Sequence, residues 1–365
     1  MLLVIRFCSC TAPSINDCWK FAKGNIDMSM LSQQAVWTNI TLPHTWNGYD
    51  GQNGGDDYYR GTGWYMRALS FDKNDRGKCI YLRFGAANYL TEVYLNGVSI
   101  GTHSGGYTSF AFDITPFVRY DMSNQLLVKV SNADGLPIPP LSADFTFFGG
   151  LIRGVELIKK NKLHITAEDY GSNGVYVRQD KVSDKEAMLS FTAKVRNTEK
   201  KAQKAVISFL IKERDGKVLK ETKEEKMILP GTTMPITSTF RIDNPHLWNG
   251  KKDPYLYTAE VKVKVGSEIA DNYTFPLGIR YYSIDPDRGF ILNGHSYPLR
   301  GVSLHEERKN KGNAVSDTER KEDIDRIIAM GSNYIRLSHY QHGDFTYRYL
   351  DSLGIICWTE TPVIN

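Results

Sequence analysis

The stretch between Asn333 and Glu360 constrains the fold of this chain more than any other part of the sequence. A short apolar segment at 334–337 ends in a cluster of polar residues, and a run with apolar residues at helical spacing follows at 345–353. Gly354 ends that run, and a second apolar segment leads to Glu360. The pattern predicts strand–helix–strand, with polar groups at the carboxyl ends of the strands, where parallel sheets place their functional sites.

The segment before it repeats this pattern. Residues 297–305 predict a strand that ends in a histidine. A helix begins at the capping-box sequence Ser316-Asp-Thr-Glu319, which satisfies free amides of the first turn, and Gly331 ends that helix. The order β-α-β-α-β therefore places four polar side chains at strand ends, namely His305, Arg336, His339 and Glu360. Any one of them alone is as easily a core histidine or a surface arginine, but four in one layer favour a functional site.

Three strings in this region carry a family resemblance. They are RGVSLHEE from Arg300, NYIRLSHY from Asn333 and LDSLGIICWTETP from Leu350. They resemble the first three barrel strands of glycoside hydrolase family 2, which contains β-galactosidases, β-glucuronidases and β-mannosidases. The family string usually has Pro after Ser-His-Tyr, where this chain has Gln341. The resemblance implies that residues 283–365 are the first βαβαβ part of a (β/α)8 TIM barrel, which is then incomplete.

Residues 14–163 predict an all-β sandwich of short strands separated by turn signals, with Asn96-Gly97 as a strong hairpin signal. Four strings, LPHTWN, YYRGTGWY, FGAANYLTEVYLNG and DFTFFGGLIRGVEL, resemble the N-terminal jelly-roll sugar-binding domain of the same family. The resemblance implies that Asp144 reaches the sugar subsite of the barrel and that Asn88 contributes to it. The alternatives are that Asp144 caps a turn and that Asn88 adopts a positive φ.

Residues 164–282 predict a second sandwich. About seven strands at regular spacing, without a cysteine pair, favour an immunoglobulin-like β-sandwich, which the family has here as a spacer. Asp215-Gly216 predicts another hairpin. Lysines and glutamates at 217–226 indicate a solvated edge strand, which discourages pairing with other chains. The predicted fold is therefore multidomain: a jelly-roll sandwich, an immunoglobulin-like sandwich and the start of a TIM barrel.

The predicted barrel part lacks the two catalytic carboxyl groups of the family. Retaining glycoside hydrolysis needs two carboxyl groups about 5–5.5 Å apart. In this family both catalytic glutamates lie on later barrel strands, so we expect them beyond Asn365 and predict no catalytic residue here. Residues 286–365 are roughly a third of the ~250 residues of a complete barrel. We expect a fragment of a longer protein or a gene cut short. If these residues are the whole chain, we expect no glycosidase activity. We also expect poor solubility unless a partner covers the barrel edge, because open barrel edges invite pairing with other chains.

The resemblance assigns substrate binding to six residues: Asn88, Asp144, His305, Arg336, His339 and Glu360. It implies that Glu360 lines the pocket, that Arg336 orients a downstream carboxylate by a charge-assisted pair, and that both histidines hydrogen-bond sugar hydroxyls. Some β-galactosidases of the family bind Mg²⁺ through Glu-x-His shortly after the strand-three glutamate, but residues 361–365 supply neither ligand. We therefore predict no metal and no cofactor.

Net charge, apolar runs and cysteine spacing limit the partners and the cellular location that can be predicted. A net charge of +4 on 365 residues, without a basic stripe, does not indicate binding to nucleic acid. No apolar run reaches about 18 residues, so no membrane span is predicted. The five cysteines have no regular spacing, which argues against a disulfide framework or a zinc site. The apolar residues 1–10 are either the remnant of a signal or lipoprotein leader, which favours a periplasmic or secreted location, or an imperfect start of the coding region.

Three functional hypotheses follow. The first is a retaining, exo-acting β-glycosidase of carbohydrate metabolism, with β-galactosidase the most frequent activity. Its close alternative is a β-glucuronidase, whose basic residues for the sugar carboxylate are expected downstream. The second is a non-catalytic carbohydrate-binding protein derived from the family. The third, a structural interaction protein, has only the aromatic content of 12% in its favour. The expected partner is a carbohydrate, with homo-oligomerisation left open.

Overall fold

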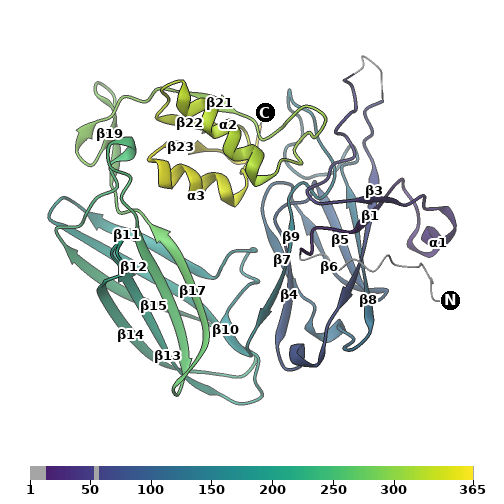
Figure 1. Ribbon diagram of the computed structural model, residues 1–365, viewed down its shortest axis with the longest axis horizontal. Coiled ribbons are helices and arrows are strands. Elements are labelled where there is room, and N and C mark those ends of the chain that lie inside the picture. The colour runs from purple at the N-terminus through teal and green to yellow at the C-terminus, as the bar shows by residue number, and fades with distance from the viewer. Residues whose placement is uncertain (1–13, 53–56, 365) are drawn as a thin grey trace.

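The computed structural model describes residues 14–52 and 57–364. Figure 1 shows two β-sandwiches standing side by side, with a small unit of helices and parallel strands lying above them. The chain passes through the first sandwich, then the second, then this upper unit. Lys160 and Asp271 join the two sandwiches through an ion pair of 2.9 Å. The predicted order of three units is confirmed.

The first sandwich packs a six-stranded sheet, in the order β2-β1-β3-β8-β5-β6, against a three-stranded sheet, β7-β4-β9. Every residue of β4 is buried, and side chains such as Tyr65, Phe84 and Val128 fill the core between the sheets. The elements in chain order are β1 (Trp19–Lys23), η1 (Met28–Met30), α1 (Leu31–Gln34), β2 (Thr38–Ile40), β3 (Thr62–Ser70), η2 (Lys73–Asp75), β4 (Cys79–Phe84), β5 (Leu90–Leu95), β6 (Val98–Ser104), β7 (Phe110–Asp113), η3 (Thr115–Phe117), β8 (Ser123–Ser131) and β9 (Val155–Lys160).

The hairpin between β5 and β6 turns at Asn96 and Gly97, whose φ angles are 56° and 82°. A type I′ turn needs positive φ at both central residues, and Asn followed by Gly adopts it at low cost. This hairpin was predicted from sequence and is confirmed.

The second sandwich consists of two four-stranded sheets. One has the order β14-β13-β16-β17, and the other joins β10, β11 and β15 to β12. Leu163 pairs with Asn197 of β12, so the change from the first sandwich to the second falls just before Leu163. The charged strand β14 pairs only with β13 among the described residues, which confirms the predicted edge strand. The elements are β10 (Leu163–Ile165), β11 (Val175–Val182), β12 (Glu186–Asn197), β13 (Gln203–Lys212), β14 (Val218–Ile228), β15 (Thr233–Asp243), η4 (Gly250–Lys252), β16 (Tyr257–Val265) and β17 (Glu268–Leu277).

The upper unit begins after a small linking sheet of β18 (Tyr282–Asp285), β19 (Gly289–Leu292) and β20 (His295–Ser296). Its own strands are parallel and lie in chain order: β21 (Gly301–Leu304), β22 (Tyr334–Leu337) and β23 (Ile356–Thr359). Helices α2 (Asp317–Ala329) and α3 (Asp344–Leu353) connect these strands. This is the βαβαβ part of a barrel that the sequence predicts.

Alternation along β22 separates a helix-facing side from an open side. Ile335 and Leu337 are completely buried in the core that the strands share with α2 and α3. Arg336, between them, therefore points to the opposite side. Ser303 and Trp358 pair with Arg336 in the sheet and share that side, which in a closed barrel faces the interior.

Both helices of the upper unit begin and end where the sequence predicts. The Ser316 side chain accepts from the Glu319 amide, and the Glu319 carboxylate accepts from the Ser316 amide at 2.9 Å. Gly331 and Gly354 follow the two helices in left-handed conformations, with φ of 91° and 73°. A Cβ added at Gly354 would come within 2.3 Å of the Gly250 backbone, whereas one at Gly331 would meet nothing within 4 Å. Gly354 thus also allows the second sandwich to approach α3 closely.

The cysteines, membrane-spanning helices and metal sites can be compared with the sequence predictions. Cys18 is disulfide-bonded, which the irregular cysteine spacing did not predict, whereas Cys79 and Cys357 are free thiols. Within residues 14–52 and 57–364, no helix combines the length and the apolar character needed to cross a membrane. Over the same residues, no group of three His, Cys, Asp or Glu side chains is placed to hold a metal ion.

Candidate functional site

The carboxyl ends of the three parallel strands bring the predicted barrel residues together. Leu304, Leu337 and Thr359 pair in the last row of the sheet. Each strand then continues into polar residues at the same edge. We call this place the strand-end site, and it comprises His305, Arg336, His339 and Glu360.

Arg336 and Glu360 form a bidentate ion pair at the base of the strand-end site. Arg336 Nε lies 2.7 Å from Glu360 Oε1, and Nη2 lies 3.1 Å from Oε2. The hydrogen bonds from Arg336 are the largest cause that lowers the pKa of the Glu360 carboxyl. Because the guanidinium and the carboxylate meet through two parallel hydrogen bonds, the pair fixes both side chains in position and keeps the carboxylate ionised.

His339 adds a third contact to the Glu360 carboxylate. Its Nδ1 atom lies 3.2 Å from Glu360 Oε2, and its backbone also hydrogen-bonds this carboxylate. His339 has a left-handed backbone with φ of 71°, so the chain turns sharply just after β22. The turn brings its ring to 5.1 Å from the ring of His305, measured between centroids.

His305 lies against Tyr340, whose hydroxyl is 3.4 Å from His305 Nδ1. Burial is the largest cause that lowers the pKa of His305, and the neighbouring His339 and Arg336 lower it further. Asp144 acts in the opposite direction. The net effect favours a neutral imidazole at pH 7.

The first sandwich reaches the strand-end site through residues 144–148. The Phe145 ring is nearly parallel to the His339 ring, with 5.8 Å between centroids, and lies 5.4 Å from the His305 ring. Asp144 is exposed, and its charge acts on His305. Its carboxylate makes no hydrogen bond within the described part of the chain, so it does not cap a turn. Its contact with a sugar stays a prediction.

Asn88 lies beneath this segment and not at its surface. The side chain is completely buried, and its Nδ2 atom donates to the Phe148 carbonyl at 2.9 Å. Its backbone forms a bridge with Gly150. Asn88 is not among the residues with positive φ, which excludes the alternative considered from the sequence. Asn88 therefore holds the segment that carries Asp144 and Phe145, and its direct part in sugar binding stays a prediction.

The sequence did not reveal a buried ion-pair cluster behind the strand-end site. Glu306 accepts hydrogen bonds from Arg153 of the first sandwich at 3.1 Å, from Arg320 of α2 at 2.8 Å and from the Gly343 amide at 2.8 Å. Burial alone would raise the pKa of Glu306. The charges of Arg153, Arg320 and His342 outweigh burial and lower that pKa to about 2.

Glu306 follows His305 directly, so this cluster fixes the segment that carries a predicted site residue. Arg153 also donates to the Gln341 carbonyl at 2.6 Å, just after His339. The only sequence signal was the second polar residue at the strand end in RGVSLHEE. Nothing in that string indicates which cations lie around it.

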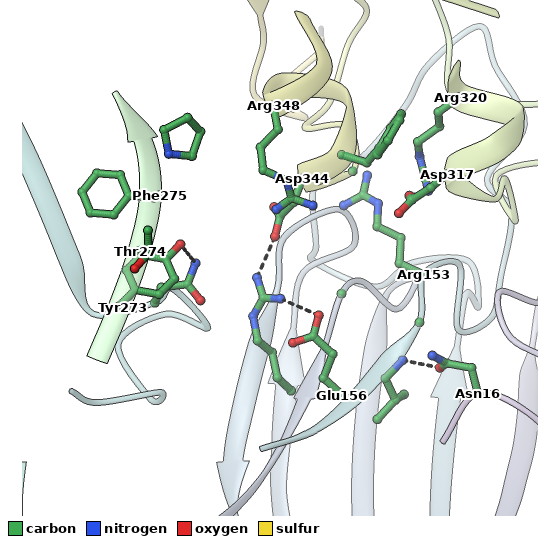
Figure 2. A pocket seen from close by; sticks show the side chains of 18 residues that line it. Asn16, Arg153, Glu156, Tyr273, Thr274, Phe275, Asp317, Arg320, Asp344 and Arg348 are labelled. Carbon is green, nitrogen blue, oxygen red and sulfur yellow. Dashed lines mark hydrogen bonds and ion pairs between the residues drawn. The ribbon is translucent and has the colours of Figure 1, made fainter. Parts of the chain in front are cut away.

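A cavity of about 510 Å³ opens where the three units meet. Figure 2 shows Tyr273 of the second sandwich on the left, Asp344 at the start of α3 near the centre, and Arg153 of the first sandwich to the right. Arg83 of β4 connects the first sandwich to α3, with its Nη2 atom 2.9 Å from Asp344 Oδ2. None of the six predicted site residues lines this cavity, so it is separate from the strand-end site.

The fold defines a class of multidomain proteins in which two β-sandwiches precede a barrel-type βαβαβ unit, and barrel enzymes carry their sites at the carboxyl ends of the strands. Three family models match the chain in the same order. They are "Glycosyl hydrolases family 2, sugar binding domain" over residues 21–161, "Glycosyl hydrolases family 2" over 171–280 and "Glycosyl hydrolases family 2, TIM barrel domain" over 286–365. The chain belongs to glycoside hydrolase family 2, a family of glycosyl hydrolases.

Known relatives agree with this placement. A β-glucuronidase of Bacteroides fragilis is 38% identical over 327 residues, which cover 89% of this chain and 47% of the relative. A β-galactosidase of Bacteroides ovatus is 31% identical and covers 89% of this chain and 38% of the relative. The structure of Bacteroides uniformis β-glucuronidase 2, covalently bound to cyclophellitol-6-carboxylate aziridine, matches with a TM-score of 0.89 and 36% identity, over 96% of this chain and 42% of that one. The chain thus spans about half or less of the length of these relatives.

Proposed function

We propose that this chain carries the sugar-recognition part of a retaining, exo-acting β-glycosidase that removes terminal β-linked sugars. The observation that carries the proposal is the meeting of two units at one site. Phe145 of the first sandwich lies against His305 and His339 of the barrel unit. Ligand pockets form preferentially between domains. A barrel site walled by a second domain suits an exo-acting enzyme, because it admits the end of a sugar chain and not its middle.

The side chains at the strand-end site match the chemistry of a sugar ring. Sugar hydroxyls both donate and accept hydrogen bonds, and imidazoles and carboxylates supply the complementary groups. The Glu360 carboxylate, held by Arg336, offers a fixed acceptor. Hydrogen bonds to ring hydroxyls that strengthen in the transition state contribute several kcal/mol in glycoside hydrolysis.

Neither Glu360 nor Glu306 fits the role of the catalytic acid. A carboxyl group that protonates a leaving oxygen needs a pKa near the working pH. Hydrogen bonds from Arg336 lower the pKa of Glu360, and the charges around Glu306 hold its pKa at about 2. We therefore place the acid/base and the nucleophile on later barrel strands, as the family resemblance implies, and Glu360 in the floor of the pocket.

For the substrate we favour a β-glucuronide, with a β-galactoside second. The support is the β-glucuronidase of B. fragilis and the B. uniformis β-glucuronidase, whose covalently bound inhibitor is named as a 6-carboxylate. The sequence alone had placed β-galactosidase first, and a β-galactosidase is also among the relatives. Arg336 already pairs with Glu360, so a cation for the sugar carboxylate has to come from another residue.

The test is hydrolysis of 4-nitrophenyl β-D-glucuronide and 4-nitrophenyl β-D-galactoside by the protein expressed from its complete coding region. We expect nitrophenol release, faster from the glucuronide, and no release from residues 1–365 alone. His339→Ala should lower kcat/KM by roughly tenfold or more, because it removes a hydrogen-bonding group and its contact with Glu360. The matched control is His295→Ala on an exposed strand, which should leave kcat/KM unchanged. Sugar binding without hydrolysis would contradict the proposed enzyme and favour a non-catalytic carbohydrate-binding protein.

A further inference from the structure

We infer that the cavity where the three units meet is a second carbohydrate site, which takes a neutral, hydroxyl-rich ligand such as a short oligosaccharide. Its volume of about 510 Å³ lies within the range of about 300–1,000 Å³ that is typical of ligand pockets, and such pockets form preferentially at domain interfaces. The inference goes beyond the proposed function and does not depend on it, because the cavity contains none of the residues assigned to the strand-end site.

The charges around the cavity are balanced. Four arginines and three carboxylates line it, and a fourth carboxylate, Glu306, accepts hydrogen bonds from two of these arginines, Arg153 and Arg320. An anion would be repelled by the carboxylates and a cation by the arginines, so neither gains a net attraction. The balance favours a ligand without net charge, which binds through hydrogen bonds.

Arg83 holds two of the lining carboxylates in fixed positions. It donates to Glu156 at 3.3 Å and to Asp344 at 2.9 Å, and its Nε atom donates to the Gly171 carbonyl at 2.6 Å. Both carboxylates are more than half exposed. Within residues 14–52 and 57–364, each keeps one oxygen that accepts no hydrogen bond. Two fixed acceptors of this kind suit the hydroxyl groups of a sugar ring.

Donors come from α3 and from the second sandwich. Arg348 is exposed and makes no ion pair or hydrogen bond with any residue that the structure describes. The Tyr273 hydroxyl accepts from Asn173 Nδ2 at 2.7 Å, so its own hydrogen is left to donate to a ligand. Burial is the largest cause that raises the pKa of Tyr273, and the charges of Arg348, Asp344 and Arg83 act on it as well. These donors and acceptors therefore surround one space.

Aromatic side chains add an apolar surface to the cavity. Phe275 lines it from β17 and Phe345 from the start of α3, and both rings are half-buried. Figure 2 shows Phe275 and Tyr273 on the left, with Asp344 and Arg348 nearer the centre. The C–H faces of a sugar ring pack on aromatic rings, while its hydroxyls bind the polar groups around them. Fixed acceptors, free donors and aromatic rings together match a carbohydrate.

The test is calorimetric titration of trisaccharides into the 365-residue chain. The neutral probes are cellotriose, maltotriose and xylotriose, and the acidic probe is trigalacturonate. We expect at least one neutral trisaccharide to bind, and to bind more tightly than trigalacturonate. Arg348→Ala should weaken this binding roughly tenfold or more, because it removes a charged donor. Tyr273→Phe should weaken it roughly two- to tenfold, because it removes only the hydroxyl.

Two matched controls should bind the trisaccharide as the original chain does. They are Arg326→Ala on the exposed side of α2 and Tyr282→Phe on β18, where the side chain is exposed. His339→Ala separates the two sites, because it changes the strand-end site and should leave binding in the cavity unchanged. Urea unfolding of each variant shows that a lost affinity is not a lost fold.

Several results would overturn the inference. They are the absence of binding by all three neutral trisaccharides, tighter binding of trigalacturonate, and an affinity that Arg348→Ala and Tyr273→Phe leave unchanged. Binding that is lost in His339→Ala and kept in Arg348→Ala would place the sugar in the strand-end site and overturn it as well. Failure of the complete protein to hydrolyse nitrophenyl glycosides would count against the proposed function alone, since the trisaccharide titrations do not depend on hydrolysis.

Discussion

Arg153 of the first sandwich and Glu306 of the barrel unit form a buried ion pair across the boundary between the two units, with Nη2 3.1 Å from Oε2. Both side chains are almost fully buried, at 10% and 4% exposure. The pair fixes the sandwich that carries Phe145 relative to the strand end that carries His305. The pair therefore fixes how the two units meet beside the proposed sugar site.

Arg153→Met should destabilise the chain by about 3–5 kcal/mol, because it leaves a buried carboxylate with one cation fewer. It also removes the hydrogen bonds to the Tyr107 and Gln341 carbonyls. The measurement is the free energy of unfolding in urea. Arg76→Met is the control, since Arg76 pairs with Asp121 at the surface, where both side chains are more than half exposed. The control should cost less than about 1 kcal/mol. Equal costs for the two variants would contradict the structural role of Arg153.

Arg336→Lys should weaken the binding of methyl β-D-glucuronide by roughly tenfold with little loss of stability. Lysine keeps the charge but cannot donate from two points to Glu360, so the carboxylate loses its fixed orientation. Arg336 is 39% exposed, so the stability change should stay within about 1 kcal/mol. Calorimetry measures the affinity, and Arg326→Lys, at an exposed pair on α2, should leave it unchanged. An affinity equal to that of the original chain would rule out Glu360 as a sugar acceptor.

Gly354→Ala should cost several times more stability than Gly331→Ala. Both glycines follow a helix in a left-handed conformation, so each alanine costs about 1 kcal/mol from backbone strain. Only at Gly354 does the added Cβ also meet backbone, at 2.3 Å from Gly250. The difference between the two free energies of unfolding measures the packing of α3 on the second sandwich. Similar values would mean that this packing is loose.

Acid should destabilise the chain in part through His342. Burial is the largest cause that lowers the pKa of His342 to about 4 from its ordinary 6.5. Between these two values the unfolded chain binds a proton that the folded chain does not, so stability falls as pH drops from about 6.5 to about 4. The loss is about 3 kcal/mol. Glu306 has a lowered pKa, so its contribution is lost at still lower pH, between about 4.5 and about 2.

The check is urea unfolding at several pH values for the original chain and for His342→Gln. The variant should lose stability less steeply between pH 6.5 and 4, since the buried histidine no longer titrates. His295→Gln, at an exposed position, should keep the original slope. An unchanged slope in His342→Gln would place the acid sensitivity in another group, such as the partly buried His44, whose pKa burial lowers to about 4.

Local features of this fold could be predicted from the sequence. The hairpin at Asn96-Gly97 and the capping box at Ser316 depend on residues within a few positions of each other, and the structure has both. The strand-end residues could also be placed, since parallel strands bring their carboxyl ends to one edge whatever the loops do. His305, His339 and Glu360 lie together for that reason.

The long-range contacts could not be predicted in the same way. Arg153 and Glu306 are 153 positions apart, and no local pattern links an arginine in one sandwich to a carboxylate after a barrel strand. The burial of Asn88 under the Phe148 carbonyl depends on how a separate loop folds over it. The disulfide at Cys18 was missed because cysteine spacing is informative only when it is regular.

The most direct test of a sugar site shared by two units is calorimetric titration of methyl β-D-glucuronide into the 365-residue chain and its variants. We predict saturable binding that Phe145→Ala in the first sandwich and His339→Ala in the barrel unit each weaken by roughly tenfold or more. Tyr170→Ala, at a side chain that is 89% exposed, should bind as the original chain does. Undiminished binding by Phe145→Ala, or no binding of any β-glycoside by the original chain, would contradict the shared site.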